Sequence, residues 1–245
     1  MTFRYLTAVR EVIDRLETTQ AEAIERAAEL VIRSITGGGV VFCAEIGHGT
    51  QGDFLNRAGG LAAVQPFAAS LSVTDPVPDC LRNRPRASDA DREIEAIRAA
   101  VATSSVRPGD VIMVGSVSGR NVRPIEQALA FRAQGGHAIG LTAFSYSADV
   151  ESLHPSGKRL RDAVDVAIDI GTPYGDAAVQ IPGIEPKVMP VSGVAFDVAG
   201  WMIWERVMTR MAAAGDPPTV YMSVNGAGGQ AYYEAARARY NERGY

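Results

Sequence analysis

A turn rich in hydroxyl groups follows one of the apolar runs of the chain. It reads Ser116-Val117-Ser118-Gly119-Arg120-Asn121 and lies between the run 111–114 and a helix predicted to begin near Pro124. A turn of small polar residues that leads into a helix leaves backbone N–H groups unpaired, with the positive end of the helix dipole behind them. Such groups form a site for an anion, most often a phosphate. The alternative is an ordinary strand-to-helix turn in which Asn121 is the N-cap.

A second polar loop carries groups that could transfer protons. Glu45 and His48 lie in the stretch 45–50, directly after the apolar run 40–44, and Asp53 follows them. Carboxylates and imidazoles are the usual general acids and bases near neutral pH. The carboxylates also have structural alternatives. Glu45 could be a strand-end group bound to local amides, and Asp53 an acid favoured by the N-terminus of a helix.

Further titratable residues could belong to the same site. His154 shares a polar segment with residues 156–159, which is either a mobile arm that reaches a neighbouring subunit or an exposed loop. Glu126 lies in the first turns of the helix after the anion-binding turn, where it could bind ligand hydroxyl groups or stabilise the helix. Asp176 is another polar candidate whose position cannot be read from spacing. His137 begins an apolar run and is predicted to be structural.

The histidines and cysteines predict neither a metal site nor a disulfide. His48, His137 and His154 are far apart and match no zinc spacing. Cys43 lies inside a predicted buried strand, and we expect it and Cys80 to be plain thiols. The sequence therefore predicts no metal and no other cofactor.

The composition predicts a globular protein with a substantial core. The chain has 245 residues, of which 47% are hydrophobic, and a formal net charge of −4. We expect a single α/β domain over residues 1–245. Lysines and arginines are scattered, so we expect no nucleic-acid partner. The apolar stretches are too short to span a membrane and the N-terminus lacks a signal-peptide pattern, which predicts a cytoplasmic protein with no membrane association.

Strand and helix patterns alternate along the chain. Short apolar runs predict buried strands at 40–44, 61–64, 111–115, 137–142 and 164–170. Helical spacing predicts helices at 2–17, 19–36, 50–58, 89–104, 124–134, 192–213 and 228–241, with irregular segments at 145–161 and 171–190. This alternation predicts a parallel sheet wound by helices, which binds ligands beyond the carboxyl ends of its strands. The loops 45–50, 115–121 and 142–147 would meet there.

Several motifs occur in a specific order. A Gly-His-Gly-Thr loop spans 47–50, the serine-rich turn spans 116–121, and Thr142-Ala143-Phe144-Ser145 follows the next strand. Together they resemble the phosphosugar-binding fold of the sugar isomerase (SIS) family. A second set resembles the bacterial SIS-domain proteins of the UPF0309 type, which are related to phosphoheptose isomerase. This set consists of Arg57-Ala58-Gly59-Gly60, Ser118-Gly119-Arg120-Asn121 with Pro124-Ile125-Glu126, His154-Pro155-Ser156-Gly157-Lys158-Arg159-Leu160 and Gly175-Asp176-Ala177-Ala178.

The resemblance implies a three-layer α/β/α sandwich with a five-stranded parallel sheet, and a small-molecule sugar phosphate as ligand. It also implies a homodimer or homotetramer, for which the helices within 2–36 and 192–241 are the expected interface. By this resemblance the phosphate would be held by Ser116, Ser118, Asn121 and the backbone of Gly119. Thr142 and Ser145 would complete the site, and Arg120 could add charge.

The first loop departs from the family pattern. Members of the family usually have a Gly-Ser-Gly type of loop, whereas this chain has Glu45-Ile46-Gly47-His48. If the carboxylate of Glu45 points into the cleft, it opposes a nearby phosphate by on the order of 1 kcal/mol. Either the ligand is shifted, or Glu45 has a catalytic or sugar-binding role.

Three functions are compatible with these residues. The first is an aldose–ketose isomerase of a sugar phosphate, in which Asp53 is the base at carbon and His48 carries protons, with Glu45 and His154 as further candidates. The second is a lyase or etherase acting on an amino-sugar phosphate. The third is a phosphosugar sensor without catalysis.

Overall fold

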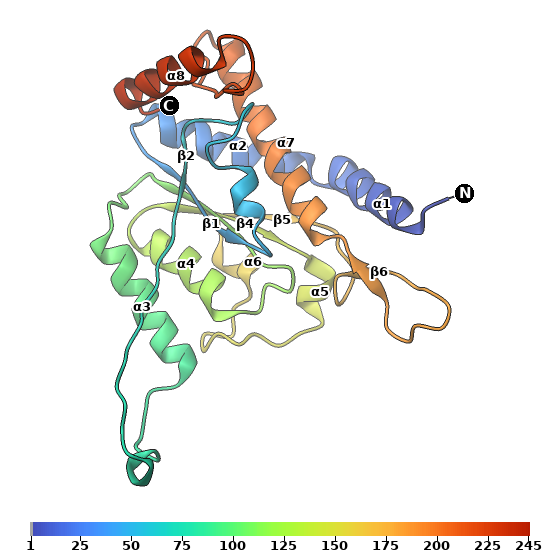
Figure 1. Ribbon diagram of the computed structural model, residues 1–245, viewed down its shortest axis with the longest axis vertical. Helices are drawn as coiled ribbons and strands as arrows, with labels where there is room; N and C mark the ends of the chain where they lie inside the picture. The colour runs from blue at the N-terminus through green and yellow to red at the C-terminus, as the bar shows by residue number, and fades with distance from the viewer. Residues whose placement is uncertain (1) are drawn as a thin grey trace.

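The computed structural model describes residues 2–245 and contains a central parallel sheet (Figure 1). The strand order is β2-β1-β3-β4-β5, and every neighbouring pair is parallel. The strands are β1 (Val41–Ile46), β2 (Val64–Pro66), β3 (Val111–Gly115), β4 (His137–Thr142) and β5 (Val166–Asp169). The chain therefore has the predicted three-layer α/β/α fold with five parallel strands.

Helices cover both faces of the sheet. One face packs against α1 (Arg4–Thr19), α2 (Ala21–Thr36) and α7 (Ser192–Ala213). The other face packs against α3 (Asp89–Thr103), α4 (Val122–Ala133) and α6 (Leu160–Ala163). The remaining elements are η1 (Thr50–Asp53), η2 (Asp79–Leu81), α5 (Phe144–Ala148), β6 (Ala177–Val179), β7 (Val188–Pro190) and α8 (Gly229–Arg243).

The strands are apolar on both faces because helices bury both. In β1, Val41 and Cys43 belong to the core under α2 and α7, whereas Phe42 and Ala44 belong to the core under α3 and α4. This alternation follows from the period of two of a strand. The inner side of α7 is buried within the chain, because residues such as Phe196 and Trp204 pack in the core that α7 shares with α2.

Four predicted elements differ from the structure, and the first is the segment 145–161, which is not wholly irregular because most of α5 lies in it. The helix predicted through residue 58 is wrong: only the 3-10 helix η1 forms, and beyond it Asn56 adopts a left-handed φ of 47°, which a continuing helix does not allow. The strand predicted at 61–64 begins at Val64 instead, since Leu61 pairs with Val220. The segment 171–190 is not wholly irregular, because it forms the antiparallel hairpin of β6 and β7.

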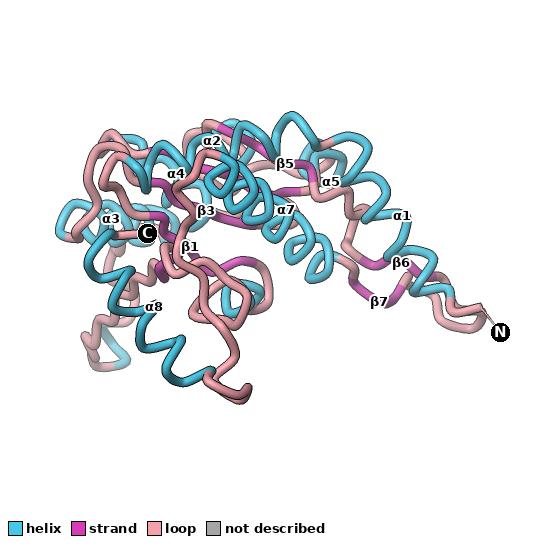
Figure 2. Tube along the Cα trace, turned by 90° about the horizontal axis from the view of Figure 1, so that it is seen from above, coloured by secondary structure: helices cyan, strands magenta, loops and turns pink. Residues whose placement is uncertain are grey.

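One end of the molecule extends away from the sheet. Figure 2 shows α1 and the β6–β7 hairpin reaching out together. A side chain of α1 contacts the backbone of the hairpin: Nη1 of Arg4 donates a hydrogen bond to the carbonyl of Gln180 at 2.9 Å. The base of this extension lies beside the carboxyl end of β5, so it forms one border of the edge where ligands are expected to bind.

Candidate functional site

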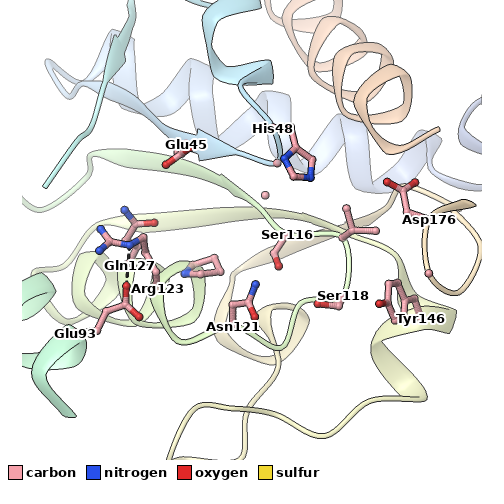
Figure 3. Close-up of a pocket in the computed structure, with 15 residues that line it drawn as sticks. Glu45, His48, Glu93, Ser116, Ser118, Asn121, Arg123, Gln127, Tyr146 and Asp176 are labelled. Carbon is pink, nitrogen blue, oxygen red and sulfur yellow. Dashed lines mark ion pairs between the residues drawn. The ribbon is translucent and has the colours of Figure 1, made fainter. Parts of the chain in front are cut away.

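A cavity of about 580 Å³ opens at the carboxyl ends of β1 and β3 (Figure 3). Its walls come from four parts of the chain: the end of β1, the turn between β3 and α4, the α3–α4 pair, and the region of α5 and the 175–176 loop. The polar residues that line it are Glu45, His48, Glu93, Ser116, Ser118, Asn121, Arg123, Gln127, Tyr146 and Asp176. This is the edge of the sheet at which a doubly wound fold binds ligands.

The turn between β3 and α4 presents unpaired backbone donors. The N–H groups without an acceptor in residues 2–245 include those of Val117, Ser118, Arg120 and Asn121. Gly119 adopts a left-handed φ of 62°, which turns the chain back toward the helix. Successive free amides in a turn of this kind form an anion-binding concavity.

The start of α4 leaves its dipole uncompensated. Asn121 occupies the N-cap position, but its side chain makes no capping hydrogen bond, and the first turn contains no acidic residue. The side chain of Asn121 lines the cavity, near Ser116 and Ser118 (Figure 3). Asn121 is therefore the N-cap by position, as the alternative expected, but its side-chain amide does not cap the helix and is available to a ligand.

Residues 153–160, which follow α5, form hydrogen bonds to the side of the turn that faces away from the cavity. The N–H of Leu160 donates to the carbonyl of Gly119 at 2.8 Å, and the N–H of Leu153 donates to that of Arg120 at 2.9 Å. A Cβ on Gly119 would lie 2.7 Å from Oγ1 of Thr142, whose hydroxyl donates to the carbonyl of Val117 at 3.2 Å. These contacts fix the carbonyl groups on the protein side of the turn.

Glu45 and His48 lie on the wall opposite the serines (Figure 3). The pairing of β1 with β3 is irregular between Cys43 and Ile46, and such an irregularity redirects side chains. Ile46 is fully buried in the core, whereas Glu45 is exposed. Neither Glu45 nor His48 has a side-chain hydrogen bond or ion pair within residues 2–245. The departure from the family loop thus places a free carboxylate and a free imidazole in the cavity.

The third wall combines an ion pair with an amide. Nε of Arg123 lies 2.8 Å from Oε1 of Glu93, and Nη1 of Arg123 donates to the carbonyl of Ala69 at 3.0 Å. Gln127 follows Arg123 by one helical turn of α4. The charge of this arginine is therefore largely compensated by its own carboxylate partner.

The fourth wall is formed by Tyr146 and Asp176. The ring of Tyr146 packs against Tyr174 with 4.6 Å between centroids. Oδ1 of Asp176 accepts hydrogen bonds from the N–H groups of Val191 at 3.1 Å and Ser192 at 2.9 Å. Asp176 therefore anchors the start of α7, and this use of its carboxylate accounts for its position without any catalytic role.

The geometry is accompanied by clear similarity to known proteins. The family model described as the SIS domain matches residues 4–143. The chain belongs to the SIS-domain family. A UPF0309 protein of Listeria monocytogenes is 31% identical to this SIS-domain protein over 242 residues, which cover 98% of this chain and 95% of the relative. A UPF0309 protein of Streptomyces avermitilis is 30% identical over 244 residues, with 98% and 95% covered.

A solved structure confirms the fold of this SIS-domain protein. The phosphoheptose isomerase of Francisella tularensis superposes with a TM-score of 0.50 at 12% identity, covering 83% of this chain and 94% of that chain. At this identity the likeness concerns the fold alone. The resemblance inferred from the motifs, to SIS-domain proteins of the UPF0309 type, is confirmed.

Several predicted site residues of this SIS-domain protein lie outside the cavity. Asp53 forms an ion pair with Arg57 in and after η1 and does not line the cavity. Thr142 is fully buried behind the turn, and Ser145 lines a different cavity. Arg120 and Gly119 also do not line the cavity, and the N–H of Gly119, which was expected to hold the phosphate, donates to the carbonyl of Ser116 at 3.1 Å. These positions follow from the packing of the loops, which spacing in the sequence does not specify.

His154 and Glu126 form a buried pair beside the turn. Nε2 of His154 lies 2.9 Å from Oε2 of Glu126, and Nε of Arg98 donates to Oε1 of Glu126 at 2.8 Å. Both side chains of the pair are almost completely buried. Nδ1 of His154 lies 2.7 Å from Oγ of Ser156. The prediction of an arm or an exposed loop is therefore wrong for His154, because hydrogen bonds hold it against α4.

Four polar residues that line the cavity were not predicted from the sequence: Glu93, Arg123, Gln127 and Tyr146. A signal was present for part of this set, because Arg123 and Gln127 are spaced i, i+4 on the helix that begins at the anion-binding turn. Tyr146 is adjacent to the predicted Ser145, but the helix α5 turns the two side chains to different cavities. Glu93 lies on α3 and becomes visible only through the packing of α3 on α4.

Other chemistries receive little support from the described residues. Burial raises the pKa of the Cys43 thiol to about 12, so a thiolate nucleophile does not form within β1 near neutral pH. Residues 2–245 contain no cluster of three or more histidine, cysteine or acidic side chains arranged for a metal ion. Within the same residues, no helix has the length and apolar character needed to cross a membrane.

Proposed function

We propose that this SIS-domain protein binds a sugar phosphate in the 580 Å³ cavity, with the phosphate group at the turn 115–121. The observation that carries this proposal is the set of unpaired amides at the start of α4, next to the free side chain of Asn121. Amides, hydroxyls and the helix dipole stabilise a dianion without a fixed cation. The fold that it shares with a phosphoheptose isomerase supports the same ligand class.

The opposite wall supports an aldose–ketose isomerase. Isomerisation removes a proton from one carbon next to the carbonyl, forms an enediol and returns a proton to the neighbouring carbon. In this proposal Glu45 removes and returns the proton at carbon, and His48 transfers the proton between the two oxygens. Both side chains line the cavity and are free of partners in the described chain, whereas Asp53 is paired with Arg57.

The first test is binding. Sugar phosphates and their unphosphorylated parents are compared by thermal shift and calorimetry, and phosphorylated ligands are expected to bind with at least about tenfold higher affinity. Ser118→Ala should weaken the phosphorylated ligands and leave the parents unchanged. Equal binding of both ligand classes would contradict the assignment of the turn as the phosphate site.

The second test is exchange of solvent deuterium into the carbon next to the carbonyl of any bound sugar phosphate. Glu45→Gln and His48→Ala should each reduce the exchange rate by about 100-fold or more, since a positioned acid or base contributes 10²–10⁴-fold. Asp53→Asn is the matched control outside the cavity and should retain exchange. Loss in Asp53→Asn with retention in Glu45→Gln would reverse the assignment of the base.

The outcome also separates the alternative functions. Binding without exchange would favour a sensor, and an eliminated product from an amino-sugar phosphate would favour a lyase or etherase. A cytoplasmic location and a homodimer or homotetramer formed through helices within 2–36 and 192–241 remain predictions of the sequence. The mass in solution, measured by light scattering, tests the oligomeric state.

A further inference from the structure

A second cavity of about 250 Å³ lies next to the first, at the base of the extension formed by α1 and the β6–β7 hairpin. Its polar lining residues are Glu11, Arg15, Ser145, Thr172 and Lys187. They come from α1, α5, the loop after β5 and the hairpin. The two cavities are different sites, because no residue lines both.

The second cavity contains cations without partners. Arg15 and Lys187 have no carboxylate oxygen within 4 Å and no side-chain hydrogen bond in residues 2–245. Glu11 also lines the cavity and offsets part of this charge. The lining nevertheless retains a net positive charge of one, counting two cations and one carboxylate, in a protein whose formal net charge is −4.

The loop after β5 contacts the side chain of Arg15. Gly171 has a left-handed φ of 65°, and a Cβ at this position would lie 2.6 Å from Cδ of Arg15. The aliphatic part of Arg15 therefore packs directly on the backbone of Gly171, and a side chain there would displace it. The contact holds the guanidinium group beside the cavity.

A buried hydroxyl in the same place has no partner. Thr172 is fully buried, and its Oγ1 forms no hydrogen bond in residues 2–245. Buried hydroxyls are nearly always satisfied, and an orphan one indicates a missing partner. The hydroxyl of Ser145 lies on the same cavity and adds a second donor.

We propose that the second cavity binds a small oxyanion, the phosphate or carboxylate group of a metabolite. Arg15 and Lys187 neutralise its charge, and the hydroxyls of Thr172 and Ser145 donate hydrogen bonds to its oxygens. The ligand is small, since the cavity has less than half the volume of the first. This site adds to the proposed sugar-phosphate site and does not depend on it.

The test is calorimetric titration of the full chain with inorganic phosphate and, separately, with malonate. Arg15→Met keeps the aliphatic stem and removes the charge, and we expect at least a tenfold loss of affinity for the anion at the second cavity. Arg10→Met is the matched control, because Arg10 is exposed on the same helix and lies outside both cavities. It should bind like the wild type.

A second variant separates binding from folding. Thr172→Val keeps the shape of the side chain and removes the orphan hydroxyl, so the free protein should melt at the same or a higher temperature while anion affinity falls. Binding of phosphate alone identifies a phosphate ligand, and binding of malonate as well extends the site to carboxylates. The proposal is overturned if neither anion binds, or if Arg15→Met and Thr172→Val both bind like the wild type.

The two sites can fail independently. Asn121→Asp should weaken the binding of phosphate at the first cavity. It should leave unchanged the binding at the second cavity, which is the binding that Arg15→Met weakens. Phosphate binding that depends only on Asn121 would overturn the second site and leave the proposed function intact. Binding that depends only on Arg15 would contradict the proposed function and support the second site.

Discussion

The two neighbouring cavities that we propose as anion sites differ in the groups that they offer to a ligand. The first offers backbone amides, hydroxyls and the amino end of α4, and its arginine, Arg123, is already paired with Glu93 at 2.8 Å. The second offers two cations, Arg15 and Lys187, and the buried hydroxyl of Thr172, none of which has a side-chain partner in the described part of the chain. They share the short helix α5, which directs Tyr146 to the first cavity and Ser145 to the second.

Because the two cavities offer different groups, different substitutions should lower their affinity for an anion. A site made of amides depends on the conformation of the backbone, so it is sensitive to residues that never touch the ligand. A site made of cationic side chains depends on charge, so it is sensitive to single charge removals and to salt. The following variants and conditions separate the two kinds of site.

The largest effect is expected from Gly119→Ala. A left-handed conformation costs a residue with a Cβ about 1–2 kcal/mol, and the new atom would lie 2.7 Å from Oγ1 of Thr142. The turn should shift, and phosphate affinity at the first cavity should fall by roughly 100-fold, as for other misplaced binding geometry. Calorimetry should show that the second cavity still binds phosphate with the affinity of the wild type.

The matched control is Gly157→Ala. Gly157 has a φ of 70°, and a Cβ there would have no atom within 4 Å. This variant carries the same backbone cost without the collision, so it should lose stability but retain phosphate binding. Equal loss of binding in both variants would mean that general destabilisation, not the shape of the turn, weakens the first cavity.

Asn121→Asp should have opposite effects on stability and binding. A carboxylate at the N-cap of α4 interacts favourably with the helix dipole and raises the free energy of unfolding by about 0.3–1 kcal/mol. The same charge repels a phosphate at the turn, so affinity at the first cavity should fall by roughly tenfold. Thermal unfolding and calorimetry measure the two effects. A variant that gains neither stability nor repulsion would show that the side chain lies away from the helix end.

Salt should affect the second cavity more strongly. An increase from about 0.1 M to about 1 M potassium chloride shortens the Debye length from about 10 Å to about 3 Å. Affinity at the second cavity should fall several-fold more than affinity at the first, because it rests on the net charges of Arg15 and Lys187. Titrations of wild type at both salt concentrations give this ratio, and equal salt slopes would remove the distinction between the sites.

The smallest effect is expected from Glu93→Gln. Removal of the carboxylate frees the charge of Arg123, which stays in place through its hydrogen bond to the carbonyl of Ala69. Affinity for phosphate at the first cavity should rise about two- to threefold, in line with a partly exposed charge. The salt dependence of phosphate affinity at the first cavity should then approach that at the second cavity. Glu95→Gln is the control, since Glu95 pairs with Arg98 outside this cavity.

The sequence predicted the sheet and the anion-binding turn for the same reason. Both depend on local patterns: buried strands read as short apolar runs, and the turn 116–121 has its glycine and helix start at fixed spacing. Predictions were weaker where glycine-rich segments allow several conformations. The 3-10 helix η1 and the late start of β2 at Val64 are examples.

The members of each cavity could be predicted only in part. Residues that come directly after a strand, such as Glu45 and Ser116, were expected at the ligand-binding edge and lie there. Ser145 was expected at the phosphate turn, but α5 rotates successive side chains by about 100°, which places it in the second cavity. The pair of Glu93 and Arg123 joins residues thirty positions apart and depends on how α3 packs on α4.

By itself, the sequence determined the fold and the presence of a polar turn at the start of a helix, because strand period, helix starts and glycine positions are local properties of the chain. The tertiary structure alone decided which charges remain free. It buried His154 on Glu126, paired Arg123 with Glu93 and left Arg15, Lys187 and Glu45 without side-chain partners among residues 2–245. Pairing of charges depends on distances of a few ångströms between elements remote in sequence, and only the packing of those elements sets such distances.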